Sequence, residues 1–122
     1  MDKNEHAIMV ANERIKEVEK AISERRKDLL EDLTEGDEIK ICHADVSNYN
    51  SAVALRDDLK EFITCVRIGG PIEETLAEYT EKAIDITAEL RCTELAQSMS
   101  QAVREFGYVV AEANRMESLE NA

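Results

Sequence analysis

The chain has 122 residues and a formal net charge of −12, from 27 acidic residues against 15 Lys or Arg. This length predicts a single domain, residues 1–122, and suffices to bury a core without metal or disulfide support. The excess of acid excludes the clustered Lys and Arg that neutralise phosphates, so we expect no direct nucleic-acid partner. Three Tyr, two Phe and no Trp predict a core built mainly from aliphatic side chains.

The sequence has no feature of a membrane or secreted protein. No stretch approaches the roughly 20 apolar residues that cross a bilayer, and the charged residues 1–14 lack the apolar run of a signal peptide. The three cysteines are odd in number and widely spaced, which is typical of reduced thiols. We therefore expect a cytoplasmic protein that does not bind membranes.

Residues 2–34 have the pattern of one long helix. Their apolar side chains recur every three or four residues, and four of them form one heptad column: Ile8, Ile15, Ile22 and Leu29. Such a column either packs inside a helical bundle or forms a seam between two copies of the chain. The long apolar stripes of all the helices favour the presence of a second copy, and hence a homo-oligomer, with a dimer preferred.

A short connector is predicted over residues 36–46. Gly36 is a suitable C-terminal cap for the first helix. Ile39 and Ile41 then alternate with Lys40 and Cys42, which fits either a short strand or an irregular linker. The irregular linker is preferred, because a single short strand has no visible partner.

A second helix is predicted over residues 47–68. Asp45 or Ser47 can cap its N-terminus. Its apolar stripe consists of Ala52, Leu55, Leu59, Phe62, Ile63 and Val66.

The run Gly69, Gly70, Pro71 separates the second helix from the third. Pro71 suits the first helical position, where no amide hydrogen is needed. Glu73 and Glu74 follow, and their charge favours the positive end of a helix dipole. The shortness of the connection predicts an antiparallel pair of helices.

The last part of the chain carries two apolar stripes that differ in phase. They indicate helices over residues 71–96 and 99–119, either continuous or broken near residues 93–100. A single helix over residues 71–119 would be about 73 Å long at a rise of about 1.5 Å per residue, which is too long for one small globule. We therefore predict an all-α fold, a bundle of three or four long antiparallel helices.

Five carboxylates of the third helix are predicted to share one face. Glu74, Glu78, Glu81, Asp85 and Glu89 follow one another at spacings of four, three, four and four residues. This face is either ordinary solvated surface or a docking surface for a protein with a basic surface, where complementary charge raises association rate and selectivity. Our leading hypothesis is the second: a non-enzymatic interaction module, an inhibitor or adaptor that occupies its partner and also self-associates.

Two other functions stay open. One is a homo-oligomeric structural or small-ligand-binding protein. The other is a metal-dependent all-α nucleotide phosphohydrolase, in which acids of the second and third helices would face one another and hold Mg²⁺. The acids concerned are Asp57, Asp58, Glu61, Glu78, Glu81 and Asp85.

The spacing of these acids argues against the enzyme. All-α nucleotide pyrophosphohydrolases use a Glu-Glu-x-x-Glu motif followed by Glu-x-x-Asp, whereas here Glu78 follows Glu74, and Asp85 follows Glu81, one residue too late. The chain also lacks a Gly-rich phosphate loop and the closely spaced Cys and His ligands of a zinc site. We therefore expect no enzyme activity, no metal and no cofactor.

Overall fold

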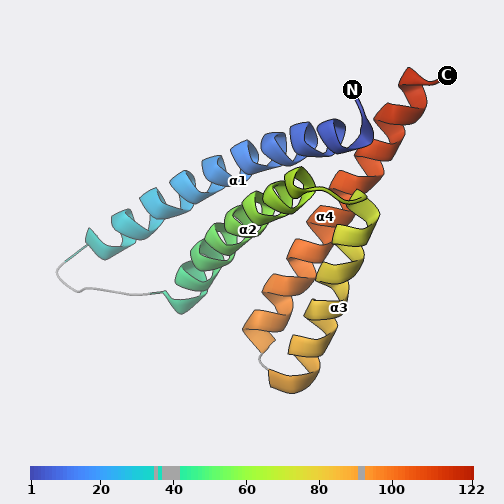
Figure 1. Cartoon of the computed structure of the whole chain (residues 1–122). Coiled ribbons are helices and arrows are strands. Elements are labelled where there is room, and N and C mark those ends of the chain that lie inside the picture. The colour runs from blue at the N-terminus through green and yellow to red at the C-terminus, as the bar shows by residue number, and fades with distance from the viewer. Residues whose placement is uncertain (35, 37–41, 91–92) are drawn as a thin grey trace.

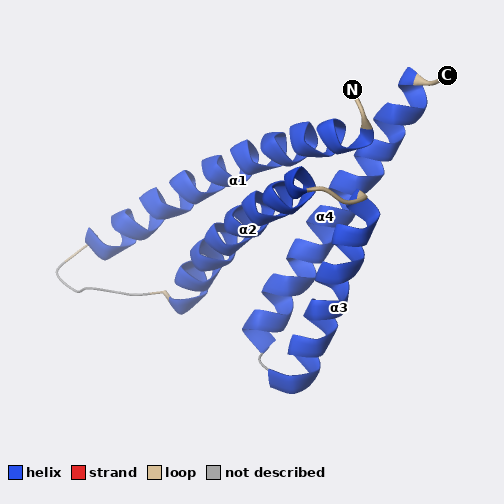
Figure 2. Ribbon diagram, viewed as in Figure 1, coloured by secondary structure: helices blue, strands red, loops and turns tan. Residues whose placement is uncertain are grey.

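The computed structural model describes residues 1–34, 36, 42–90 and 93–122. It contains four helices: α1 (Lys3–Thr34), α2 (His43–Ile68), α3 (Ile72–Leu90) and α4 (Thr93–Glu120). No strand occurs in these residues (Figure 2), which confirms the all-α prediction. Ile39 and Ile41, the candidate strand, lie outside the described residues. Within the described ranges, no helix is both long enough and apolar enough to cross a membrane.

The helices form two antiparallel hairpins that share one core (Figure 1). α1 packs along α2 and α3 packs along α4, while α1 and α2 also contact α4. The hairpins diverge from the region around the start of α1, so the last turns of α1 and of α3 lie at separate corners of the molecule (Figure 1). α4 makes most of the contact between the two hairpins, because it packs against α1 and α2 more extensively than α3 does.

Three aromatic side chains from three helices meet in the core. The rings of Phe62 in α2 and Phe106 in α4 stack with centroids 4.7 Å apart. The ring of Tyr79 in α3 approaches Phe106 edge-on, also at 4.7 Å. Offset and edge-on contacts between aromatic rings add to the stabilisation from burial. This cluster therefore ties α2, α3 and α4 together at one point.

α2 begins four residues earlier than the capping signals predicted. It starts at His43, and the preceding Cys42 is extended with no side-chain capping bond. The first helical hydrogen bond runs from the Val46 amide to the Cys42 carbonyl at 3.1 Å. The predicted cap at Asp45 or Ser47 is therefore wrong. Asp45 lies within the first turn instead, where its charge interacts favourably with the helix dipole.

The predicted antiparallel pairing of the second and third helices is wrong, because α2 packs mainly along α1 and α3 along α4, with little contact between α2 and α3. The ends of α3 and α4 also differ from the prediction. The Pro71 carbonyl accepts bonds from the amides of Glu74 at 3.0 Å and Thr75 at 3.3 Å, so Pro71 caps α3 one residue before its first helical position. α3 and α4 are separate helices, but residues 93–100, where the sequence pattern predicts the break, belong to α4, which begins at Thr93 rather than at residue 99. The polar residues Gln97, Ser100 and Gln101 lie on the exposed side of α4, where water solvates them and they are compatible with a helix.

Two glycines give a paired test of the fold. Gly70 has φ of 145°, a conformation that strains any residue with a Cβ, whereas Gly107 lies inside α4 with no atom within 4 Å of an added Cβ. We expect Gly70→Ala to lower the free energy of unfolding by about 1–2 kcal/mol. Gly107→Ala should raise it by about 0.5–1 kcal/mol. Urea denaturation followed by circular dichroism measures both, and a loss of stability at Gly107 would contradict its open surroundings.

Candidate functional site

The carboxylates predicted on one face of α3 lie on its outer surface. Glu74, Glu78, Glu81 and Asp85 are all exposed. Within the described part of the chain, none of the four forms an ion pair. The side chain of Glu89 lies outside what the structure describes. The opposite side of α3 faces the core through Ile72, Thr75, Leu76, Tyr79 and Ala83.

An apolar strip borders these carboxylates. Ile84 is 63% exposed, and Ala77 and Ala88 are exposed on the same side of the helix. Their spacing of seven and four residues aligns them along the axis, next to Glu81. We call Glu74, Glu78, Glu81, Asp85, Ala77, Ile84 and Ala88 together the acidic–apolar surface. Sequence reasoning missed its apolar part, although Ile84 stands visibly outside the inward stripe of α3.

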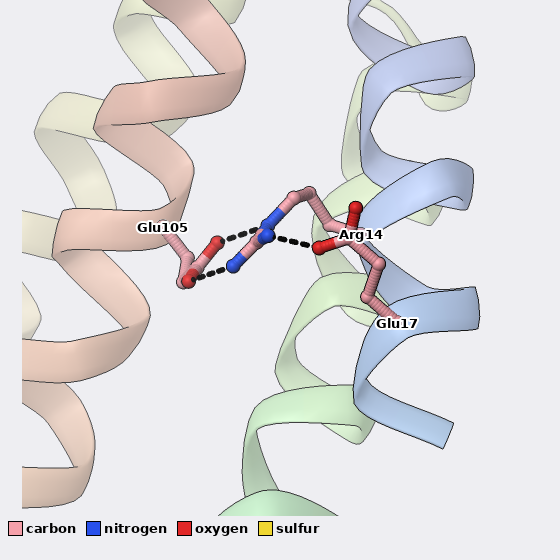
Figure 3. Close-up of polar contacts among 3 residues, drawn as sticks. All are labelled: Arg14, Glu17 and Glu105. Carbon is pink, nitrogen blue, oxygen red and sulfur yellow. Dashed lines mark hydrogen bonds and ion pairs between the residues drawn. The ribbon is translucent and has the colours of Figure 1, made fainter. Parts of the chain in front are cut away.

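Acids elsewhere in the chain connect helices instead. The Arg14 guanidinium of α1 donates from Nε to Glu105 Oε2 at 2.9 Å and from Nη2 to Glu105 Oε1 at 2.6 Å, which links α1 to α4 (Figure 3). The same guanidinium bonds Glu17 on its own helix. At the start of α1, Lys3 Nζ donates to Glu73 Oε1 of α3 at 2.8 Å. Carboxylates elsewhere in the described residues thus do form ion pairs, unlike the four on the acidic–apolar surface.

A pocket of about 260 Å³ lies between α2, α3 and α4. Asp58, Glu61, Tyr79 and Lys82 line it, and the remaining wall is mostly apolar. Burial, and then the nearby carboxylates of Glu61 and Asp57, raise the pKa of Asp58, while Lys82 acts in the opposite direction. Burial, together with Glu61, also raises the pKa of the Tyr79 phenol.

The pocket does not gather the acids proposed to hold Mg²⁺. Asp58 and Glu61 line it, but the third-helix acids Glu78, Glu81 and Asp85 are not among its lining residues. Asp57 points elsewhere and accepts from Arg56 Nε at 3.1 Å. In the described residues, no group of three or more His, Cys, Asp or Glu side chains is placed to hold a metal ion.

The heptad column of α1 has partners within its own chain. Ile15 and Ile22 belong to the buried core, and Ile8 packs against it. Leu29 is half-buried near the end of the helix. Because α1 packs along α2 and α4, the side chains of Ile15 and Ile22 contribute to the bundle core. Self-association stays a prediction, and any interface would need other side chains as well.

Comparisons of the chain with protein-family models, curated proteins and solved structures give no match.

Proposed function

We propose that the chain is a non-enzymatic interaction module that occupies a partner protein through the acidic–apolar surface of α3. The observation that carries this proposal is the set of four exposed carboxylates without ion-pair partners. Like charges at helix-neighbour spacing destabilise a helix by roughly 0.2–0.5 kcal/mol per pair. A partner that brings positive charge to this surface relieves that repulsion, so binding and charge neutralisation occur together.

The partner we infer is a helix or helical surface that carries Lys or Arg at helical spacing beside apolar side chains. The basic groups would face Glu78, Glu81 and Asp85, and the apolar ones would cover Ile84. Charge complementarity mainly raises the association rate and selectivity, whereas an apolar contact that excludes water supplies much of the binding energy. Such a module acts as an adaptor or as an inhibitor, according to what its partner does.

We place this module in the cytoplasm. Cys42 is exposed and Cys65 half-buried, and both are free thiols. Exposed free thiols suit a reducing compartment, which supports this location.

The test compares two charge-reversed variants of the full chain. One is Glu78→Lys/Glu81→Lys/Asp85→Lys on α3. The matched control is Glu13→Lys/Glu24→Lys/Asp28→Lys, which reverses three exposed acids of α1 and changes the net charge by the same amount. The probe is a synthetic amphipathic helix with Lys and Leu at helical spacing, and fluorescence anisotropy at low salt reports its binding.

We expect the α3 variant to bind the probe at least roughly tenfold more weakly than the wild type, since three charge contacts become repulsive. The α1 variant should bind like the wild type. Ile84→Asp should also weaken binding, although it adds only one charge. Equal binding by the two triple variants would overturn the proposal, because the effect would then depend on net charge alone. The same pair of variants then serves as bait to identify natural partners.

A further inference from the structure

The pocket between α2, α3 and α4 is lined by groups of opposite charge that form no ion pair with one another. Asp58 and Glu61 line it from α2, and Lys82 lines it from α3. In the described residues, none of these three side chains forms an ion pair. The pocket is therefore lined by carboxylates from α2 and an ammonium group from α3 that are not paired with one another.

The side chain of Tyr79 also lines this pocket, and its hydroxyl group is buried. The Tyr79 Oη atom is inaccessible to solvent and makes no hydrogen bond of normal geometry, while the nearby Glu61 carboxylate contributes to raising its pKa. The tyrosine ring is held in place by its edge-on contact with Phe106. A buried polar group that lacks a partner is costly, so a ligand that hydrogen-bonds this hydroxyl gains from its fixed position.

The rest of the wall is mostly apolar. Apart from the polar Ser98 of α4, it consists of Ile86 from α3 and Met99, Ala102 and Val103 from α4, together with Ala54 from α2. The unbranched side chain of Met99 can adjust to the shape of a ligand. A volume of about 260 Å³ lies just below the roughly 300–1,000 Å³ of pockets for drug-sized molecules. The pocket therefore suits a smaller molecule with one apolar group.

We propose that this pocket binds a free α-amino acid with an aliphatic side chain. Its ammonium group would lie against Asp58 and Glu61, its carboxylate against Lys82, and its side chain against the apolar wall. A simple amine would leave Lys82 unneutralised, and a simple carboxylate would meet two carboxylates of like charge. A zwitterion matches both kinds of charge that line the pocket. This site is separate from the acidic–apolar surface, which lies on the outer side of α3.

The first experiment titrates the full-length protein with three related probes in a calorimeter. L-leucine carries both charges, 3-methylbutylamine lacks the carboxylate, and 4-methylpentanoate lacks the ammonium group. We expect leucine to bind at least roughly tenfold more tightly than either analogue, because each loses one charge-assisted contact. Absence of leucine binding at millimolar concentration, or equal binding of the amine, would overturn the proposal.

The second experiment locates the binding with variants. Asp58→Asn should weaken leucine binding by roughly tenfold, whereas Asp57→Asn, on the exposed side of the same helix, should have a much smaller effect, because Asp57 acts on the site only through its charge. Lys82→Gln should weaken leucine binding but leave binding of 3-methylbutylamine unchanged, and Lys60→Gln is its control. Equal losses in variant and control would place the binding outside this pocket. Far-UV circular dichroism checks that each variant is folded.

Tyr79→Phe provides a variant that keeps the fold while removing a ligand contact. It retains the ring against Phe106 and removes only the hydroxyl without a partner. We expect unchanged or higher stability with weaker leucine binding. Lower stability with unchanged leucine binding would show that the hydroxyl serves the fold, which contradicts its proposed role.

Discussion

Replacing Phe106 by Ala is expected to lower the free energy of unfolding by about 3–5 kcal/mol, the usual cost of removing a buried aromatic side chain. The Phe106 side chain is fully buried. It contacts the ring of Phe62 from α2 and the ring of Tyr79 from α3. The substitution therefore removes the point at which three helices meet. Urea denaturation followed by circular dichroism measures the loss.

The control for this substitution is Tyr108→Ala on the same helix. Tyr108 is 51% exposed, and its ring lies beneath the Arg14 guanidinium at 5.6 Å. Its removal should cost less than about 1 kcal/mol, the value of an exposed cation–π contact. Since small proteins are stable by only about 5–15 kcal/mol, Phe106→Ala should leave a detectable unfolded fraction in little denaturant. Equal losses in the two variants would contradict the central place of Phe106.

The buried side of α2 could be predicted from sequence alone. All six residues of its predicted stripe are buried, because a helical period of 3.6 residues decides directly which side chains share a face. The exposure of the α3 carboxylates follows from the same rule. Local periodicity is therefore sufficient for the faces of single helices in this chain.

Helix ends and contacts between helices could not be predicted in this way. α2 starts at His43 without a capping side chain, so a search for capping residues placed its start too late. The pocket joins Asp58, Lys82 and Met99 from three helices, and their proximity depends on how the hairpins cross. Periodicity contains no information about that crossing. The candidate magnesium site therefore grouped Asp58 with acids of the third helix, whereas the structure places it beside Lys82 and Tyr79.

Among the ion pairs of the described residues, the contact between Arg14 and Glu105 is expected to contribute most to the free energy of unfolding. Exposed pairs contribute little, because water solvates both charges. The Glu105 side chain, however, is only 17% exposed and receives two nitrogens of one guanidinium (Figure 3). Such two-point bonds are stronger than single ones. The hydrogen bond to Glu105, ahead of all other causes, raises the pKa of Arg14.

We expect Arg14→Met to lower the free energy of unfolding by about 2 kcal/mol, since it leaves the Glu105 carboxylate largely desolvated and without its partner. Glu105→Gln should cost less, because the amide needs less solvation than a carboxylate. The double variant should be more stable than the sum of the two losses predicts, with a coupling energy of about 1–2 kcal/mol.

The pair of Arg115 and Glu112 provides the comparison. It has a similar geometry within α4, with Arg115 Nη2 2.9 Å from Glu112 Oε2, but the Arg115 side chain is 56% exposed. Arg115→Met should therefore cost less than about 0.5 kcal/mol. If the coupling energies of the two pairs are equal, burial does not strengthen the Arg14 contact. If Arg14 alone shows strong coupling, this ion pair contributes to holding α1, and with it the first hairpin, against α4.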